Sequence, residues 1–204
     1  LCLPATINNN LPGTELSVGA DTALNSIIMA VDKIKQSAVA SQRCFVVEVM
    51  GRNCGYLALM TALVGGAEAV TIPEIETEPE AIAQEIGRAY DRGKSHALVV
   101  VAEGSKYKAH DLEEYFNRHR ERLGFGVRAT ILGHLQRGGT PGAFDRILGT
   151  KLGAGAVKQI VEGNFGVLVG QIRSDLATTP LDIVVSSKKP LDLELVELAG
   201  VLAK

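Results

Sequence analysis

The sequence predicts an α/β fold built on parallel strands, and three observations support this prediction. Short β-branched apolar runs alternate along the chain with amphipathic stretches of helical spacing. Glycine is abundant, at 22 residues, whereas aromatic residues make up only 4% of the chain. The 204 residues are 46% hydrophobic, which allows a sizeable core in one large domain or two small ones.

The first half of the chain contains a predicted βαβ unit. Residues 21–39 carry apolar side chains at helical spacing, and the run FVVEVM at 45–50 is typical of a buried strand. A glycine turn at 51–55, a helix of small residues and a second strand at 67–73 follow. Parallel strands need a crossover of about this length, so these segments are expected to pair in one sheet.

The next helix is predicted from its boundaries. Thr77 and Glu80 have the spacing of a capping box, Pro79 fits the first turn, and Gly93 fits the C-terminal stop. The remaining elements alternate in the same way. In chain order we expect strand 96–104, helix 111–124, a strand running into a glycine turn at 127–141, helix 143–162, a short strand around VLVGQI and a final helix at 191–203.

Charge and composition exclude several classes of protein. The net charge of −2 provides no general attraction to nucleic acid or anionic membranes. No apolar run reaches the roughly 18 residues that a membrane span needs, and we expect no signal peptide. The three cysteines lack metal-ligand spacing, which favours reduced thiols and a cytoplasmic location over a reactive thiol. Because the chain starts at Leu1 inside an apolar segment, we expect it to be a fragment or one half of a longer protein.

Polar residues follow the predicted strands at the positions where open parallel sheets bind ligands. Met50, Gly51 and Arg52 follow the first strand, and the next helix is expected to offer free N–H groups to an anion. Glu103 follows another buried strand. Each signal has a structural alternative: an ordinary turn with a surface arginine, or a salt bridge for the glutamate.

The strand after residue 127 contributes further cationic residues. His134 and Arg137 lie beside paired glycines, and Arg128 is near the start of the same strand. A histidine in such a place is often structural. Together with Arg52, however, these residues predict a cationic set that Arg43 could join. With Glu103 and the amide-rich loop PATINNNLPGT at 4–14 as hydroxyl-binding groups, the set predicts a sugar-phosphate site.

Three strings resemble the phosphofructokinases: PATINNNLPGT, VVEVMGRNCGYLA and ILGHLQRGGTPGAFDRILGTKLGAGAV. The resemblance covers essentially the whole chain, as the C-terminal portion of one phosphofructokinase unit. It implies a Rossmann-like three-layer sandwich without the N-terminal nucleotide-binding part. The implied activity is the glycolytic phosphorylation of fructose 6-phosphate to fructose 1,6-bisphosphate, with ATP and Mg²⁺ bound mostly outside this segment. Ala5 stands where pyrophosphate-using members carry lysine, which favours ATP as the donor.

The resemblance also implies roles for individual residues. Thr6 would contact the sugar and the transferring phosphoryl group. Met50, Gly51 and Arg52 would line the fructose 6-phosphate pocket, and Arg52 would also stabilise transition-state charge. Glu103 would bind sugar hydroxyls.

Further positions match phosphate-binding and regulatory residues of the family. His134 and Arg137 would hold the 6-phosphate. Arg43 and Arg128 would reach into the pocket of a neighbouring subunit, which implies a dimer or a homotetramer. The positions of the bacterial allosteric nucleotide site are matched or approximated by Lys35, Glu68, Arg92 and Lys94.

The amide loop departs from the family pattern Thr-Ile-Asp-Asn-Asp, because Asn8 and Asn10 replace both aspartates. The first aspartate accepts the proton of the sugar hydroxyl, and an amide has no usable basicity. Eukaryotic second halves also lack both aspartates and bind a fructose bisphosphate effector. Residues 19–25 and 34–38 resemble those halves, whereas the MGR string resembles the bacterial enzymes. Three hypotheses stay open: a catalytic chain, a regulatory half, and an interaction subunit that retains only the fold.

The resemblance divides the chain into unequal parts. Residues 1–19 and 136–188 are expected to belong to the larger, nucleotide-side domain. Residues 20–135 are expected to form the sugar-phosphate-binding domain. The last segment, 189–204, is predicted to be a helix that returns to the first part.

Overall fold

The computed structural model describes residues 1–41 and 43–203, and the chain divides into two compact units. Unit 1 consists of Leu1–Ala23 and Gly139–Pro190. Unit 2 consists of Leu24–Gly138 and the segment from Leu191 onward. The sequence placed its two boundaries after residues 19 and 135, and the final segment in the same domain as the chain's beginning.

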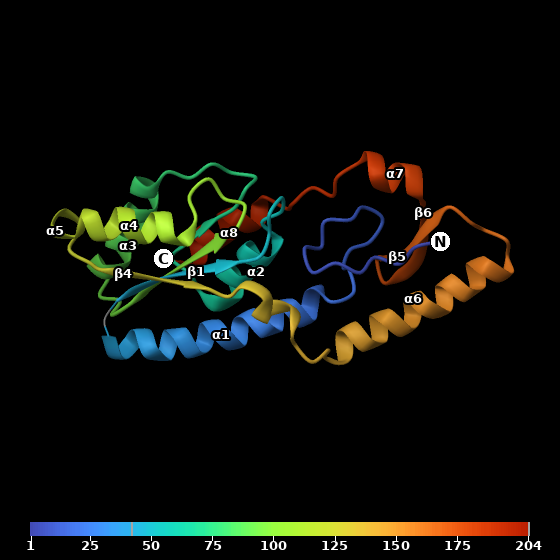
Figure 1. The fold of residues 1–204 in the computed structure, drawn as a ribbon, viewed down its shortest axis with the longest axis horizontal. Coiled ribbons are helices and arrows are strands. Elements are labelled where there is room, and N and C mark those ends of the chain that lie inside the picture. Colours follow the sequence, from blue (N-terminus) through green and yellow to red (C-terminus); the bar gives the residue numbers. More distant parts are fainter. Residues whose placement is uncertain (42, 204) are drawn as a thin grey trace. The chain divides into compact units, whose positions relative to one another are not determined.

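Unit 2 is built on a parallel sheet, as the sequence predicted (Figure 1), and the strand order of this sheet is β2-β3-β1-β4. The strands are β1 (Cys44–Val49), β2 (Ala69–Thr71), β3 (Ala97–Ala102) and β4 (Val127–Ile131). Cys44 lies opposite both Ala97 and Val127, so β1, β3 and β4 begin at one edge and run to the same opposite edge. All six residues of β3 are buried, as expected for a strand with helices on both faces.

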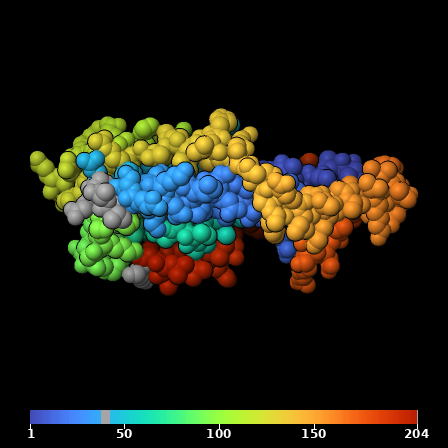
Figure 2. Space-filling model, turned by 90° about the horizontal axis from the view of Figure 1, so that it is seen from below, coloured from blue at the N-terminus to red at the C-terminus, as the bar shows by residue number. Residues whose placement is uncertain are grey.

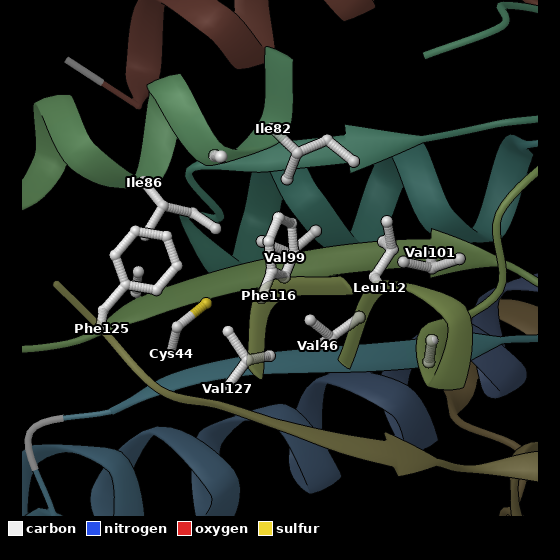
Figure 3. Close-up of a cluster of buried hydrophobic side chains, with 13 residues drawn as sticks. Cys44, Val46, Ile82, Ile86, Val99, Val101, Leu112, Phe116, Phe125 and Val127 are labelled. Atoms are coloured by element: carbon white, nitrogen blue, oxygen red, sulfur yellow. The ribbon is translucent and has the colours of Figure 1, made fainter. Parts of the chain in front are cut away.

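One face of this sheet packs on helices α3 (Pro79–Asp91) and α4 (Ala109–Arg118). Strand side chains alternate between faces, so Val46 and Val99 point the same way and contact Ile86 and Phe116 (Figure 3). These side chains form a fully buried cluster because each comes from the apolar stripe of its helix or strand. This cluster is the core of unit 2 on the α3 and α4 side of the sheet.

The other face of the sheet packs on α1 (Ala20–Ser41) and α2 (Tyr56–Gly65). Val31 of α1 and Leu98 of β3 both lie against Gly65. Unit 2 therefore has the three-layer arrangement that the resemblance implied. Within the described residues, no helix combines the length and hydropathy needed to cross a bilayer.

The last helix corrects the prediction for the chain's final segment. Helix α8 (Glu194–Leu202) packs on α2 and β2 and belongs to unit 2 rather than to the unit of the first segment. In Figure 2 its red surface lies against the teal segment that contains α2. It partly covers β2, an edge strand of the sheet.

Two predicted helix boundaries also differ from the structure. Glu78 is the N-cap of α3 and makes no side-chain cap, so the capping box predicted from Thr77 and Glu80 is wrong. The Thr77 hydroxyl instead donates to the Ile75 carbonyl at 3.4 Å. The helix predicted at 111–124 is two helices, α4 and α5 (Arg120–Leu123), on either side of His119.

Unit 1 contains an antiparallel hairpin of β5 (Val167–Ile172) and β6 (Asp175–Pro180). Helix α6 (Ala143–Val161) packs on the hairpin through Leu148 and Leu152, and the short α7 (Leu181–Ser186) follows β6. The N-terminal segment extends this sheet through Cys2. Its N–H donates to the Val167 carbonyl at 2.9 Å, and its carbonyl accepts from the Val169 N–H at 2.9 Å.

Candidate functional site: one edge of the parallel sheet

Three loops of unit 2 meet where β1, β3 and β4 end. The Glu103 N–H donates to the Val49 carbonyl at 2.8 Å, which joins the loops after β3 and β1. The Leu132 N–H donates to the Glu48 carbonyl at 3.1 Å, which holds the start of the loop after β4 against the end of β1. The turn carrying Arg52 therefore lies between the other two loops.

Two glycines allow the loops after β1 and β3 to pack closely. Gly51 has a φ of 143°, and a Cβ on it would lie 2.4 Å from the Cys54 carbonyl oxygen. A Cβ on Gly104 would lie 1.9 Å from the carbonyl oxygen of Arg52. No larger residue fits at either position without moving backbone, so the place of Arg52 next to Glu103 depends on both glycines.

The loop after β4 forms the 3-10 helix η1 (Gly133–Arg137). A 3-10 helix has three residues per turn, so His134 and Arg137 lie on the same side, and both are exposed. Gln136 is only 1% exposed. Its Oε1 accepts from the Met50 N–H at 3.0 Å, which links η1 directly to the turn before Arg52.

The charged side chains at this edge are available to a ligand. Within the part of the chain that the structure describes, Arg52, His134, Arg137 and Glu103 make no side-chain hydrogen bond or ion pair. The alternatives of a structural histidine and a glutamate held in a salt bridge therefore do not apply here. The edge brings a cationic set and one carboxylate together.

At the N-terminus of α2, where we expected free N–H groups for an anion, one N–H group is already bound by a carboxylate of the chain itself. Both carboxylate oxygens of Glu74 accept from the Gly55 N–H, at 2.9 and 3.0 Å. A carboxylate at the positive end of a helix is stabilised there, and it repels a second anion. Glu74 therefore offsets part of the positive potential of the helix end, and Arg52 and Arg137 supply formal positive charge at this edge.

Arg43 and Arg128 lie at the opposite edge of the sheet. Arg43 precedes β1, and Arg128 is the second residue of β4. Both line a cavity of about 620 Å³, together with Arg120 and Tyr90. The prediction that they join Arg52 within one chain is therefore wrong, and their role toward a neighbouring subunit stays a prediction.

The positions matched to an effector site lie close together in unit 2. Lys35, Glu68 and Lys94 line one cavity of about 420 Å³. Lys94 Nζ lies 2.8 Å from Glu68 Oε1, and the carbonyl of Ala203 accepts from both Lys94 Nζ and Arg92 Nη2, at 3.1 and 2.8 Å. Arg92 is thus linked to the cavity through Ala203 rather than lining it.

The amide loop lies in unit 1, where Thr6, Asn8 and Asn10 are half-buried. The Asn8 N–H donates to Thr6 Oγ1 at 3.3 Å. This bond links two of the three positions to which the resemblance assigns catalytic roles.

Asn9 organises the amide loop, which the sequence analysis missed. It is buried with a φ of 49°, a conformation that asparagine tolerates better than most residues. Its Nδ2 donates to the Glu15 carbonyl at 3.1 Å, and its Oδ1 accepts from the Ser17 N–H at 3.0 Å and from Lys189 Nζ at 3.1 Å. The middle amide of the three is therefore structural.

Asp145 anchors the start of α1 within unit 1. Its Oδ1 accepts from the Gly19 N–H at 2.8 Å, and its Oδ2 accepts from the Thr22 N–H at 2.9 Å and from the Thr22 hydroxyl. The carboxylate satisfies N–H groups that the helix leaves unpaired and lies at its positive end. This buried aspartate was also missed.

The residues of the site that were not predicted differ in how strong a signal the sequence gives for them. Gln136 and Asp145 lie inside the string that resembles the phosphofructokinases, and Gly104 is next to the predicted Glu103. The sequence shows that Gln136 lies next to Arg137 and two residues after His134, but it does not show that this amide is buried. Glu74 has no local signal, because its partner Gly55 precedes it by 19 residues.

The thiol of Cys44, at the start of β1, is not a candidate nucleophile for this site. Burial and the nearby Glu68 carboxylate raise the pKa of the Cys44 thiol, so it stays neutral. Across residues 1–41 and 43–203, no group of three or more His, Cys, Asp or Glu side chains is placed to hold a metal ion.

Comparison with known proteins identifies the family. Residues 1–160 match the family model described as Phosphofructokinase, so the chain belongs to the phosphofructokinase family. Over 201 residues it is 44% identical to the ATP-dependent 6-phosphofructokinase of Natranaerobius thermophilus and 42% identical to ATP-dependent 6-phosphofructokinase 1 of Thermus thermophilus. Both matches cover 98% of this chain and 62% of the relative, so the chain spans less than two thirds of their length.

Solved structures support the same fold. The phosphofructokinase of Saccharomyces cerevisiae matches with a TM-score of 0.82 and 32% identity, covering 98% of this chain and 27% of that one. A pyrophosphate-dependent phosphofructokinase from Marinobacter aquaeolei matches with a TM-score of 0.83 at 22% identity, covering 97% of this chain and 55% of that one. At that identity the second match supports the fold alone.

Proposed function

We propose that this chain is the fructose 6-phosphate-binding segment of an ATP-dependent 6-phosphofructokinase. The observation that carries the proposal is the convergence of the loops bearing Arg52, Glu103, His134 and Arg137 at one edge of a parallel sheet. Ligands of open α/β sheets bind beyond this edge. The names of the relatives at 44% and 42% identity support the same reaction.

The side chains at the edge suit a phosphorylated sugar. The guanidinium groups of Arg52 and Arg137 can each make two parallel hydrogen bonds to phosphate oxygens, and His134 adds a third donor. Glu103 accepts hydrogen bonds from sugar hydroxyls, and Met50 and Gly51 line the pocket. Arg52 would also stabilise the charge that develops on the transferring phosphoryl group.

Binding of fructose 6-phosphate tests this proposal. Titration calorimetry on the full-length protein should show binding, and Arg137→Ala should raise the Kd about 10- to 100-fold, since hydrogen bonds to charged groups contribute about 1.5–3 kcal/mol. Arg118→Ala is the matched control, because Arg118 is exposed on α4 and its side chain forms an ion pair with Glu114 on the same helix. The proposal fails if neither fructose 6-phosphate nor a fructose bisphosphate binds.

A second function is favoured by Asn8 and Asn10. Loss of a general base typically lowers a rate by about 10²–10⁴. Amides bind hydroxyls without placing negative charge beside a second phosphate, which suits a bisphosphate ligand. The alternative is therefore a non-catalytic half, like those of the eukaryotic enzymes, that binds a fructose bisphosphate as effector.

Restoring the two carboxylates separates these functions. In a catalytic chain, Asn8→Asp combined with Asn10→Asp should raise kcat in the full-length protein. In a regulatory half, the same change should leave kcat unaltered and weaken binding of fructose bisphosphate relative to fructose 6-phosphate.

Assembly and regulation are further proposals from the resemblance. A dimer or tetramer in which Arg43 and Arg128 serve a neighbouring subunit should dissociate, or lose fructose 6-phosphate affinity, when both become glutamate. An anionic effector at Lys35 and Lys94 should bind more weakly after Lys94→Ala. Sedimentation and calorimetry with ADP measure these outcomes.

A further inference from the structure

Gln136 is a buried amide between two exposed cationic side chains. It is 1% exposed, whereas His134 and Arg137 of the same 3-10 helix are exposed. With three residues per turn, residues 134 and 137 share one side of the helix and residue 136 points in another direction. Gln136 is therefore directed to the interior of unit 2 rather than to a ligand.

Both ends of the amide bind backbone groups. Oε1 accepts from the Met50 N–H at 3.0 Å, and Nε2 donates to the Gly133 carbonyl at 2.9 Å. The opposite amide orientation would place donor against donor and acceptor against acceptor, so these two partners fix the side chain. An apolar residue of similar volume would leave both backbone groups without this partner.

The two backbone groups that bind Gln136 lie at the start of the loop that carries Arg52 and at the start of η1, which carries His134 and Arg137. Met50 precedes Gly51 and Arg52, and Gly133 begins η1. On the other side of β1, next to β3, the Glu103 N–H donates a hydrogen bond to the Val49 carbonyl. The placement of the Arg52 turn relative to η1 therefore depends on the amide of Gln136.

We propose that Gln136 is a positioning residue for sugar-phosphate binding, a role that rests on the proposed function above. It acts through the backbone of Met50 and Gly133 and holds Arg52 and Arg137 at the separation that one phosphorylated sugar requires. A misplacement of about 1 Å in an active site can lower the reaction rate about 10²-fold, and we expect a similar sensitivity of the binding affinity here. The amide is thus expected to influence affinity without touching the ligand.

Gln136→Met tests the role while keeping the side-chain volume. In the full-length protein we expect the Kd for fructose 6-phosphate to rise about 10- to 100-fold while the Kd for ATP changes by less than about two-fold. Ile86→Val is the control for stability, because the Ile86 side chain of α3 is buried in the core against the sheet. It should lower the Tm and leave both Kd values unchanged.

Gln136→Glu adds a readout that a merely structural residue would not give. The introduced carboxyl accepts from the Met50 N–H, but only its protonated form can donate to the Gly133 carbonyl. The affinity deficit relative to the unmodified protein should therefore shrink as the pH falls from about 8 to about 5.5. Comparison at equal pH cancels every titration that the two proteins share, including that of the sugar phosphate.

The outcomes separate the inference from the proposed function. If the unmodified protein binds no fructose 6-phosphate, the proposed function fails and the inference fails with it. If the unmodified protein binds and Gln136→Met binds equally well, or loses affinity for ATP in the same proportion, only the inference is overturned. If the affinity of Gln136→Glu stays below that of the unmodified protein by a factor that does not change with pH, the hydrogen bond to the Gly133 carbonyl does not position the site.

Discussion

Replacing Gly104 by alanine should separate the two loops that meet beside Arg52. The new Cβ would lie 1.9 Å from the Arg52 carbonyl oxygen, 2.5 Å from its carbon and 2.8 Å from the Gly51 oxygen. Ordinary contact begins at 3.4 Å, so one backbone segment must move by about 1.5 Å. All three atoms belong to the backbone, and no side-chain rotation relieves the clash.

This displacement should affect both stability and binding. Overpacking of this kind costs about 1–3 kcal/mol, and each kcal/mol lowers the Tm of a domain of this size by about 2–4 °C, which gives a decrease of roughly 2–12 °C. A shift of more than about 1 Å at the turn of Arg52 should raise the Kd for fructose 6-phosphate about 100-fold.

Thermal unfolding and calorimetry on Gly104→Ala measure the two effects. Gly87→Ala is the matched control, because no atom lies within 4 Å of its added Cβ and an alanine inside helix α3 should stabilise by about 1 kcal/mol. Unchanged affinity in Gly104→Ala would refute the reasoning that the contact between these loops sets the position of Arg52.

Three further predictions concern other parts of the chain. Asn9→Ala should reduce the free energy of unfolding by about 1–3 kcal/mol in urea titrations, because buried partners of its amide lose their bonds; an unchanged midpoint would contradict the structural role. Cys44 should react with a thiol reagent at about pH 8 only after unfolding, whereas the exposed Cys2 serves as the reactive control. Hydrogen bonds from Arg122, and then from Tyr115, lower the pKa of Glu80 from 4.5 to about 2. The stabilisation by ionised Glu80 is therefore present above about pH 4.5 and lost as the pH falls toward about 2; the stability difference from Glu80→Gln should shrink over that window, and a constant difference would speak against it.

The parallel sheet could be predicted because its strands carry their own signal. The runs FVVEVM and HALVVVAEG are short, β-branched and almost wholly apolar, as burial on two faces demands. Parallel order then follows from the helices between them, and with it the edge where the loops of Arg52, Glu103 and Arg137 meet. The identities of the charged residues at that edge were thus accessible from sequence.

The β5–β6 hairpin was only half predictable. Strand β6 has the sequence DLATTP, and no residue of it is fully buried, so it lacks an apolar pattern. Its turn is formed by Arg173 and Ser174, which adopt φ values of 51° and 70° without the Asn-Gly or Asp-Gly pair typical of such turns. Residues 175–180 form a strand because they pair with β5. Such pairing depends on residues outside the strand and cannot be read from its own sequence.

Positioning residues escape prediction for a related physical reason. Gln136, Glu74 and Gly104 act on backbone groups that are distant in sequence, and their residue types alone do not name those partners. Because Glu74 places a negative charge at the start of α2, we expect the arginine side chains to supply most of the attraction for a phosphate. Long arginine side chains recognise one ligand only if their loops are held in register. The affinity of the proposed site should therefore respond to the buried Gln136 almost as strongly as to the exposed arginines it positions.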